Sequence, residues 1–245
     1  MKLHILGSSS SGNCYILETD TEALIIEAGV RISEVKKALK FNLGKVVGVV
    51  ISHEHKDHSG YIKEFIASGV LVLTHNSVFI ANSLLGKSFT KEIFPKRGYK
   101  VGGFLIVPFF VHHDVPCYAF IIEHKSIGKL FFSTDAVSVG VNIPDMNVIM
   151  IEANYSDVIL EENIRNGVVP FSMRNRLLSS HMEITQTKDF LMRNDLTHVN
   201  NIILIHLSNS NSDERQFVKE ITEITGCSVV VAKRGMIADI SKIPY

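Results

Sequence analysis

The sequence has no tryptophan, only three cysteines and no net charge, and the last two shortages each argue against a class of protein. The cysteines (Cys14, Cys117 and Cys227) are scattered and lack C-x-x-C spacing, so they predict a reducing compartment rather than a disulfide framework. With 25 basic and 25 acidic residues, the chain lacks the basic excess of a tight non-specific nucleic-acid binder, although a local basic patch remains compatible with this balance.

Long apolar runs are absent as well. No stretch approaches the roughly 18 apolar residues that predict a transmembrane helix. The apolar segment at Leu3 to Leu6 is too short for the core of a signal peptide. We therefore expect a soluble, cytoplasmic protein with no membrane partner.

The composition is that of an ordinary globular protein, with 46% hydrophobic residues among 245, enough to bury a sizeable core. Neither repeats nor a low-complexity linker divide the chain, so we predict a single domain over residues 1–245. Strand-like and helix-like segments alternate in two halves, which favours an α/β fold with two β-sheets packed between helices. Residues 157–194 are predicted to be helical with a break near Gly167 and Pro170. The lysine-rich stretch 87–100 is predicted to be an exposed connection.

One short segment concentrates residues that bind metals. The apolar run 46–51 predicts a buried strand, and His53, His55, Asp57 and His58 follow it directly. Neutral imidazole and carboxylate are usual ligands of zinc and related metals. A solvated polar turn is the alternative interpretation, but three histidines within six positions after a strand favour a metal site.

The pattern His-x-His-x-Asp-His after a hydrophobic strand resembles the signature of the metallo-β-lactamase superfamily. That resemblance implies a four-layer αββα sandwich with one or two metals at one edge. The superfamily's order of motifs implies one metal held by His53, His55 and His113, and a second held by Asp57, His58 and His206, with Asp135 bridging. His112 competes with His113 for its position.

A two-metal centre has a definite chemical use. Two cations can share a hydroxide nucleophile, neutralise a phosphodiester oxygen and stabilise the leaving oxyanion. Asp57 has a second candidate role, orienting the attacking water. The ligand types suit zinc or manganese, with iron as a further option. Asp135 in place of cysteine argues against an antibiotic-hydrolysing β-lactamase, and His55 in place of glutamate argues against a di-iron oxygen reductase.

Several further segments resemble the WalJ/YycJ-like group of this superfamily, which includes bacterial proteins described as 5′→3′ DNA exonucleases. These segments are residues 7–14, 51–58, 113–116, 133–135, 152–154, 174–181 and 205–208. The resemblance makes His181 a candidate general acid or phosphate contact, the alternative being a helix-capping surface histidine. Asn13, Arg174 and Arg176 are candidate substrate contacts, although two arginines on a helix face are more often simply solvated.

Two positions depart from the group's pattern, because Glu27 stands where an aspartate is usual and Tyr155 where a histidine is usual. The sequence therefore predicts a dinuclear phosphodiester hydrolase, with DNA exonuclease activity (5′→3′) as the favoured function. A phosphodiesterase acting on small or cyclic nucleotides is the alternative enzyme. A catalytically silent metal-binding regulatory module is the alternative outside enzymology. The sequence leaves the native metal and the oligomeric state open.

Overall fold

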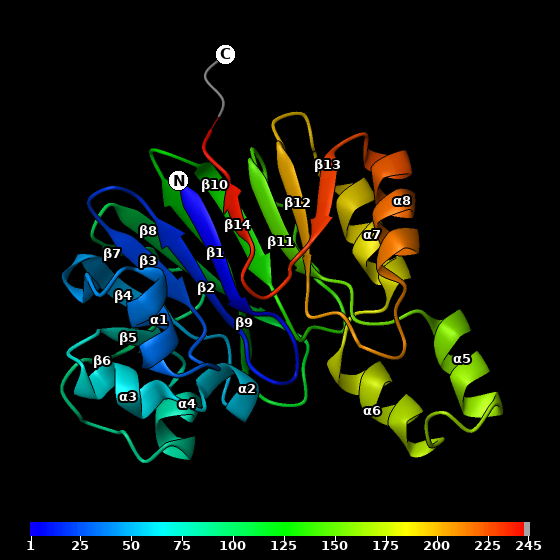
Figure 1. Cartoon of the computed structure of the whole chain (residues 1–245), viewed down its shortest axis with the longest axis horizontal. Helices are drawn as coiled ribbons and strands as arrows, with labels where there is room; N and C mark the ends of the chain where they lie inside the picture. The colour runs from blue at the N-terminus through cyan, green and yellow to red at the C-terminus, as the bar shows by residue number, and fades with distance from the viewer. Residues whose placement is uncertain (243–245) are drawn as a thin grey trace.

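Two seven-stranded mixed sheets lie face to face in the computed structural model, which describes residues 1–242 (Figure 1). The first sheet has the order β14 (Ile237–Asp239), β1 (Lys2–Gly7), β2 (Cys14–Glu18), β3 (Ala23–Ile26), β4 (Val46–Val50), β5 (Val72–Thr74), β6 (Thr90–Glu92). The second has the order β13 (Ser228–Val231), β12 (Asn201–Ile205), β11 (Val148–Glu152), β10 (Gly128–Ser133), β9 (Cys117–His124), β8 (Phe104–Val111), β7 (Tyr99–Val101).

Helices cover the outer faces of both sheets and complete four layers (Figure 1). The first sheet is covered by α1 (Ile32–Ala38), α3 (Ile62–Ala67) and α4 (Asn76–Ala81), and the second by α7 (Ile184–Arg193) and α8 (Glu214–Thr225). The remaining helices are α2 (Lys56–Ser59), the 3-10 turn Leu43–Lys45, α5 (Asp157–Arg165) and α6 (Ser172–Ser180). The predicted αββα sandwich is therefore confirmed, whereas a single domain over residues 1–245 stays a prediction.

Helices α5 and α6 project from one end of the sandwich (Figure 1). The predicted break near Gly167 and Pro170 is present, because α5 ends at Arg165 and α6 begins at Ser172. Within residues 1–242, no helix combines the length and the apolar composition that crossing a bilayer requires.

The largest hydrophobic core fills the space between the two sheets. Its aromatic centre includes Tyr15 from β2 and Phe132 from β10, whose rings meet edge to face with centroids 5.6 Å apart. A second core lies between the first sheet and its helices, and a third lies between the second sheet and its helices. Strands buried on both faces carry near-continuous apolar runs, such as Val-Ile-Met-Ile in β11, because each side of the strand packs against a layer.

The strand directions bring several strand ends to one edge of the sandwich. In the first sheet β3 and β4 are parallel, and in the second β10, β11 and β12 are parallel, so each group ends at a shared edge. Strand β8 ends there too, because two successive antiparallel pairings make it parallel to β10. A backbone hydrogen bond from Tyr118 to the carbonyl of Ser52, 3.0 Å long, joins the two sheets at this edge.

The stretch 87–100 differs from its predicted form. It contains β6, which pairs in parallel with β5 at the margin of the first sheet, and it includes the start of β7. Strand β6 reads Thr-Lys-Glu and is largely exposed, so it has no hydrophobic alternation by which a sequence pattern could reveal it. Charged residues on an edge strand discourage pairing with other molecules, which explains why this strand resembles a loop in sequence.

Replacing Phe190 by alanine tests the core beneath α7. Phe190 is fully buried, and its ring stacks on Phe131 with centroids 4.9 Å apart. We expect Phe190→Ala to lower the free energy of unfolding by about 3–5 kcal/mol in urea titrations, because it leaves a cavity. Phe171→Ala, at a ring that is 66% exposed, is the matched control and should change it by less than about 0.5 kcal/mol. Equal losses in the two variants would contradict this assignment of the core.

Candidate metal centre

The segment that follows β4 is held in place by two other loops. The backbone N–H of Asn13 donates to the carbonyl of Asp57 at 2.7 Å, and that of Ala28 donates to the carbonyl of His58 at 2.7 Å. Gly29 closes the arrangement by donating to the carbonyl of Asn13 at 2.9 Å. Backbone donors of Asn13, at the end of the serine- and glycine-rich loop, and of Ala28 therefore fix the predicted metal segment.

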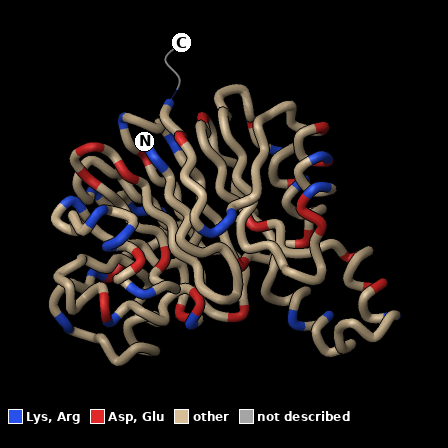
Figure 2. Tube along the Cα trace, in the orientation of Figure 1, with Lys and Arg blue, Asp and Glu red and all other residues tan. Residues whose placement is uncertain are grey.

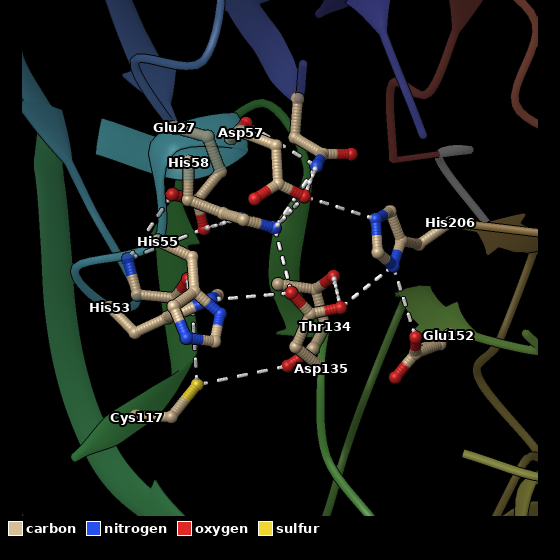
Figure 3. Close-up of polar contacts among 12 residues, drawn as sticks. Glu27, His53, His55, Asp57, His58, Cys117, Thr134, Asp135, Glu152 and His206 are labelled. Atoms are coloured by element: carbon tan, nitrogen blue, oxygen red, sulfur yellow. Dashed lines mark hydrogen bonds and ion pairs between the residues drawn. The ribbon is translucent and has the colours of Figure 1, made fainter. Parts of the chain in front are cut away.

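Two candidate ligands, Asp135 and His206, and the nearby Glu27 have strained backbones directly after strands. Glu27 follows β3, Asp135 lies just beyond β10 and His206 follows β12, and all three have positive φ, at 68°, 48° and 55°. A non-glycine residue pays for this conformation, and such strain gathers at functional sites where the surrounding structure enforces it. Each turn redirects the chain as it leaves the sheet, and the three side chains converge at the shared edge (Figure 3).

The first cluster consists of three imidazoles. The ring of His53 lies 4.7 Å from that of His55 and 4.7 Å from that of His113, measured between centroids, and His55 lies 5.1 Å from His113. Each ring offers a nitrogen within 4.8 Å of the others, as a shared cation would need. His112 is exposed and takes no part in the cluster, so the structure favours His113 for the third position.

The second cluster gathers Asp57, His58, Asp135 and His206. The Asp135 Oδ2 atom lies 2.7 Å from His58 Nε2, and its Oδ1 atom lies 2.7 Å from His206 Nδ1. The Asp57 Oδ2 atom lies 3.3 Å from His58 Nε2. Asp135 also reaches toward the first cluster, with Oδ2 3.3 Å from His53 Nε2 (Figure 3). This position between the clusters is the one a bridging carboxylate would occupy.

The surroundings shift the pKa values of the buried histidines in opposite directions. Burial and the neighbouring His58 hold the pKa of His53 well below its ordinary value. Burial would also lower the pKa of His58 and His206, but the Asp135 carboxylate holds both well above the ordinary value. Both rings therefore carry protons when only carboxylates face them. A cation needs neutral imidazoles, so its binding releases protons and its affinity rises with pH.

Several buried nitrogens fit a cation because they have no hydrogen-bond partner within residues 1–242. They are His53 Nε2, His113 Nδ1 and His206 Nε2, whereas the equally unpaired His58 Nδ1 faces Glu27 Oε1 at 3.5 Å. A buried polar atom left unsatisfied costs on the order of 1–3 kcal/mol, so such a concentration at one place requires an explanation. Coordination of divalent cations by these imidazoles and the adjoining carboxylates provides one.

Glu152 is the site residue that sequence reasoning did not select. It ends β11 and is fully buried, and its Oε1 atom lies 2.7 Å from His181 Nδ1 and 3.1 Å from His206 Nδ1. Its Oε2 atom accepts hydrogen bonds from the backbone N–H groups of Ala136 and Met182 at 3.1 and 3.2 Å. The available signal was its position, a carboxylate at the end of a strand, as for Asp135.

The two departures from the resembled group occupy different surroundings. Glu27 is fully buried, accepts a hydrogen bond from the backbone N–H of Ser52 at 3.3 Å and has Oε1 3.5 Å from His58 Nδ1. It therefore orients an imidazole of the second cluster. Tyr155 is buried instead in a small apolar cluster with Leu160 and Leu177.

The candidate substrate residues are separated by the fold. Asn13 is buried, and its side-chain amide nitrogen lies 3.0 Å from His58 Nε2 and 3.1 Å from the Ser9 carbonyl. Arg174 forms a hydrogen bond with Glu161 Oε1 at 2.5 Å. Arg176 and His181, in contrast, line a cavity of about 310 Å³ together with Asp57, Asp135 and His206. Arg176 is thus the arginine placed to meet a ligand at the metal centre.

Comparison with known proteins identifies relatives of this architecture. The family model for the metallo-beta-lactamase superfamily matches residues 9–195. Exodeoxyribonuclease YycJ of Bacillus anthracis is 31% identical, covering 94% of this chain and 92% of its own, and exodeoxyribonuclease WalJ of Streptococcus pneumoniae is 29% identical, covering 91% and 86%. The crystal structure of YhfI from Bacillus subtilis, a metallo-beta-lactamase fold protein, matches with a TM-score of 0.73 at 18% identity, covering 97% and 98%. The resemblance inferred from the motifs is confirmed.

Gly29 provides a test of the loop packing that fixes the centre. A Cβ atom there would lie 1.7 Å from the Asp57 carbonyl oxygen and 2.6 Å from the Asn13 nitrogen, so Gly29→Ala must displace the segment that carries Asp57 and His58. We expect Gly29→Ala to lose metal, as measured by elemental analysis after dialysis. Gly140→Ala is the matched control, because a Cβ there meets nothing within 4 Å. Full metal content in Gly29→Ala would rule out this role for the glycine.

Proposed function

The chain belongs to the metallo-beta-lactamase superfamily, and we propose that it is a dinuclear-metal-dependent phosphodiester hydrolase that degrades DNA from its ends as a 5′→3′ exonuclease. One observation carries the proposal: two relatives named exodeoxyribonuclease match nearly the whole chain, at 31% and 29% identity. The convergence of seven candidate ligands at one edge of the sandwich supports it. A silent regulatory module would have no need to keep this complete set.

The residues suit two divalent cations, zinc or manganese, with iron as a further option. We assign one cation to the cluster of His53, His55 and His113 and the other to that of Asp57, His58 and His206, with Asp135 shared. Bound there, the cations would supply Lewis acidity that activates water and neutralises a phosphoryl oxygen.

The protein's own residues would orient the reactants and move protons. The Asp57 side chain is 21% exposed and lines the cavity, so its carboxylate is placed to accept a hydrogen bond from the attacking water. Although burial opposes it, the Glu152 carboxylate raises the pKa of His181 to about 9. His181 is therefore protonated at neutral pH. With Nδ1 held by Glu152, its Nε2–H is left to protonate the leaving oxygen.

Few basic side chains near the centre are available to bind the substrate phosphates. Basic and acidic residues are interspersed over the whole molecule, in keeping with its zero net charge (Figure 2). Arg176 lines the cavity of the centre and is the guanidinium available there for a phosphate oxygen. A hydrolase of small or cyclic nucleotides would need no larger basic surface, so it is the second candidate function.

The proposal is tested by hydrolysis assays on metal-loaded protein with 5′-labelled linear DNA, circular DNA and bis(p-nitrophenyl) phosphate. We expect linear DNA to be degraded and circular DNA to remain intact. Asp57→Ala should lower every measured turnover by at least about 100-fold, because it removes a candidate ligand and the group that orients water. Asp189→Ala, at an exposed carboxylate of α7, is the control and should retain activity. Turnover of the small diester alone would replace DNA by a small phosphodiester as the substrate.

His181→Ala separates proton transfer from metal binding. We expect kcat to fall about 10²–10⁴-fold, as for loss of a general acid, while the metal content stays at the level of the unmodified protein. Because the acid form of His181 is required, kcat of the unmodified protein should decline as pH rises through about 9. That decline should disappear in the variant. Loss of metal from His181→Ala would instead make His181 a ligand.

A further inference from the structure

A second cavity adjoins the metal centre. It has a volume of about 270 Å³ and lies between the loop at Ser9 and Ser10, the loop 207–211 after β12, and helix α6. Arg176, His181 and His206 line both this cavity and that of the metal centre, so the two cavities adjoin at these side chains. A group bonded to a phosphate at the centre therefore has this space beside it.

One buried polar side chain that lines this second cavity has an unpartnered acceptor. Asn154 lines the cavity and is only 5% exposed. Its Nδ2 donates to the carbonyl of His206 at 2.7 Å, which fixes the orientation of the amide. Its Oδ1 atom is buried and has no hydrogen-bond partner within residues 1–242. The Asn154 Oδ1 atom is therefore an acceptor that a hydrogen-bond donor would satisfy.

Away from the border with the metal centre, the lining of the cavity is partly apolar and partly polar but uncharged. One wall carries Met173 and Leu177 of α6, which can cover the face of a flat ring. Hydroxyl and amide side chains form much of the remaining lining, among them the exposed Ser10, Asn209 and Ser210. The only ionic groups are those on the border with the metal centre. An uncharged, ring-containing unit with polar edges matches this surface better than a phosphate, whose oxygens Asn154 Oδ1 would repel.

We propose that this second cavity is a subsite for one nucleoside unit attached to the scissile phosphate. The base would lie against Met173 and Leu177, and a donor on the base or sugar would reach Asn154 Oδ1. The scissile phosphate would then lie at the border, beside Arg176 and His181. The volume of about 270 Å³ lies just below the range of roughly 300–1,000 Å³ for small-molecule sites, so the cavity holds no more than a single unit and favours release of mononucleotides.

The inference rests on the proposed hydrolysis of nucleotide phosphodiesters, and its test measures binding instead of turnover. Thymidine and inorganic phosphate are titrated separately into manganese-loaded protein by isothermal calorimetry. Three variants are compared with the unmodified protein: Ser210→Trp, which fills the subsite, Asn154→Leu, which removes the acceptor, and Ser88→Trp, a matched control at an exposed loop serine far from α6 in sequence.

We expect thymidine to bind the unmodified protein and Ser88→Trp equally, and to bind Ser210→Trp and Asn154→Leu at least about tenfold more weakly. Inorganic phosphate should bind all four proteins with similar affinity, because it occupies the metal side of the border. Absence of thymidine binding to the unmodified protein, or equal thymidine affinity in all four, would overturn the subsite. Thymidine binding without hydrolysis of any diester would refute the proposed function and leave the nucleoside subsite standing.

Discussion

The carboxylate of Asp135 is the constraint on which the centre depends. It is 2% exposed, carries a positive φ and lies within 3.3 Å of ring nitrogens from His53, His58 and His206. Burying a carboxylate without compensation costs far more than a folded protein can tolerate. Burial by itself would raise its pKa, but the His206 and His58 imidazoles hold that pKa well below its ordinary value. The buried charge and the surrounding imidazoles therefore require one another.

The fold builds this concentration of charged side chains from both sheets. His53 and His58 come from the first sheet, whereas Asp135, Glu152 and His206 come from the second. The hydrophobic core between the sheets fixes their separation. The hydrogen bond from Tyr118 to Ser52, and that from His206 N–H to Ser8 Oγ at 3.0 Å, join them at the edge where the side chains meet. The strain at Asp135 and His206 is maintained by this packing.

Much of the architecture could be predicted from local pattern. The apolar run 46–51 before the ligand-type residues predicted β4, and the Gly167–Pro170 break separated α5 from α6 correctly. Strand β6 escaped prediction because an exposed edge strand carries no hydrophobic signal. Glu152 was not assigned to the site from the sequence, because its role depends on contacts with His181 and His206, which are 29 and 54 positions away.

The sequence by itself determined the candidate ligand types, their order along the chain and the alternation of strands and helices, because spacing and hydrophobic periodicity are local properties. Only the tertiary structure decided that His113 and not His112 faces the first cluster, and that Arg176 and not Arg174 lines the cavity. It also created the second cavity beside Asn154, whose walls come from three distant segments. These choices depend on the direction in which each side chain leaves its backbone, which packing between layers fixes and residue order alone does not.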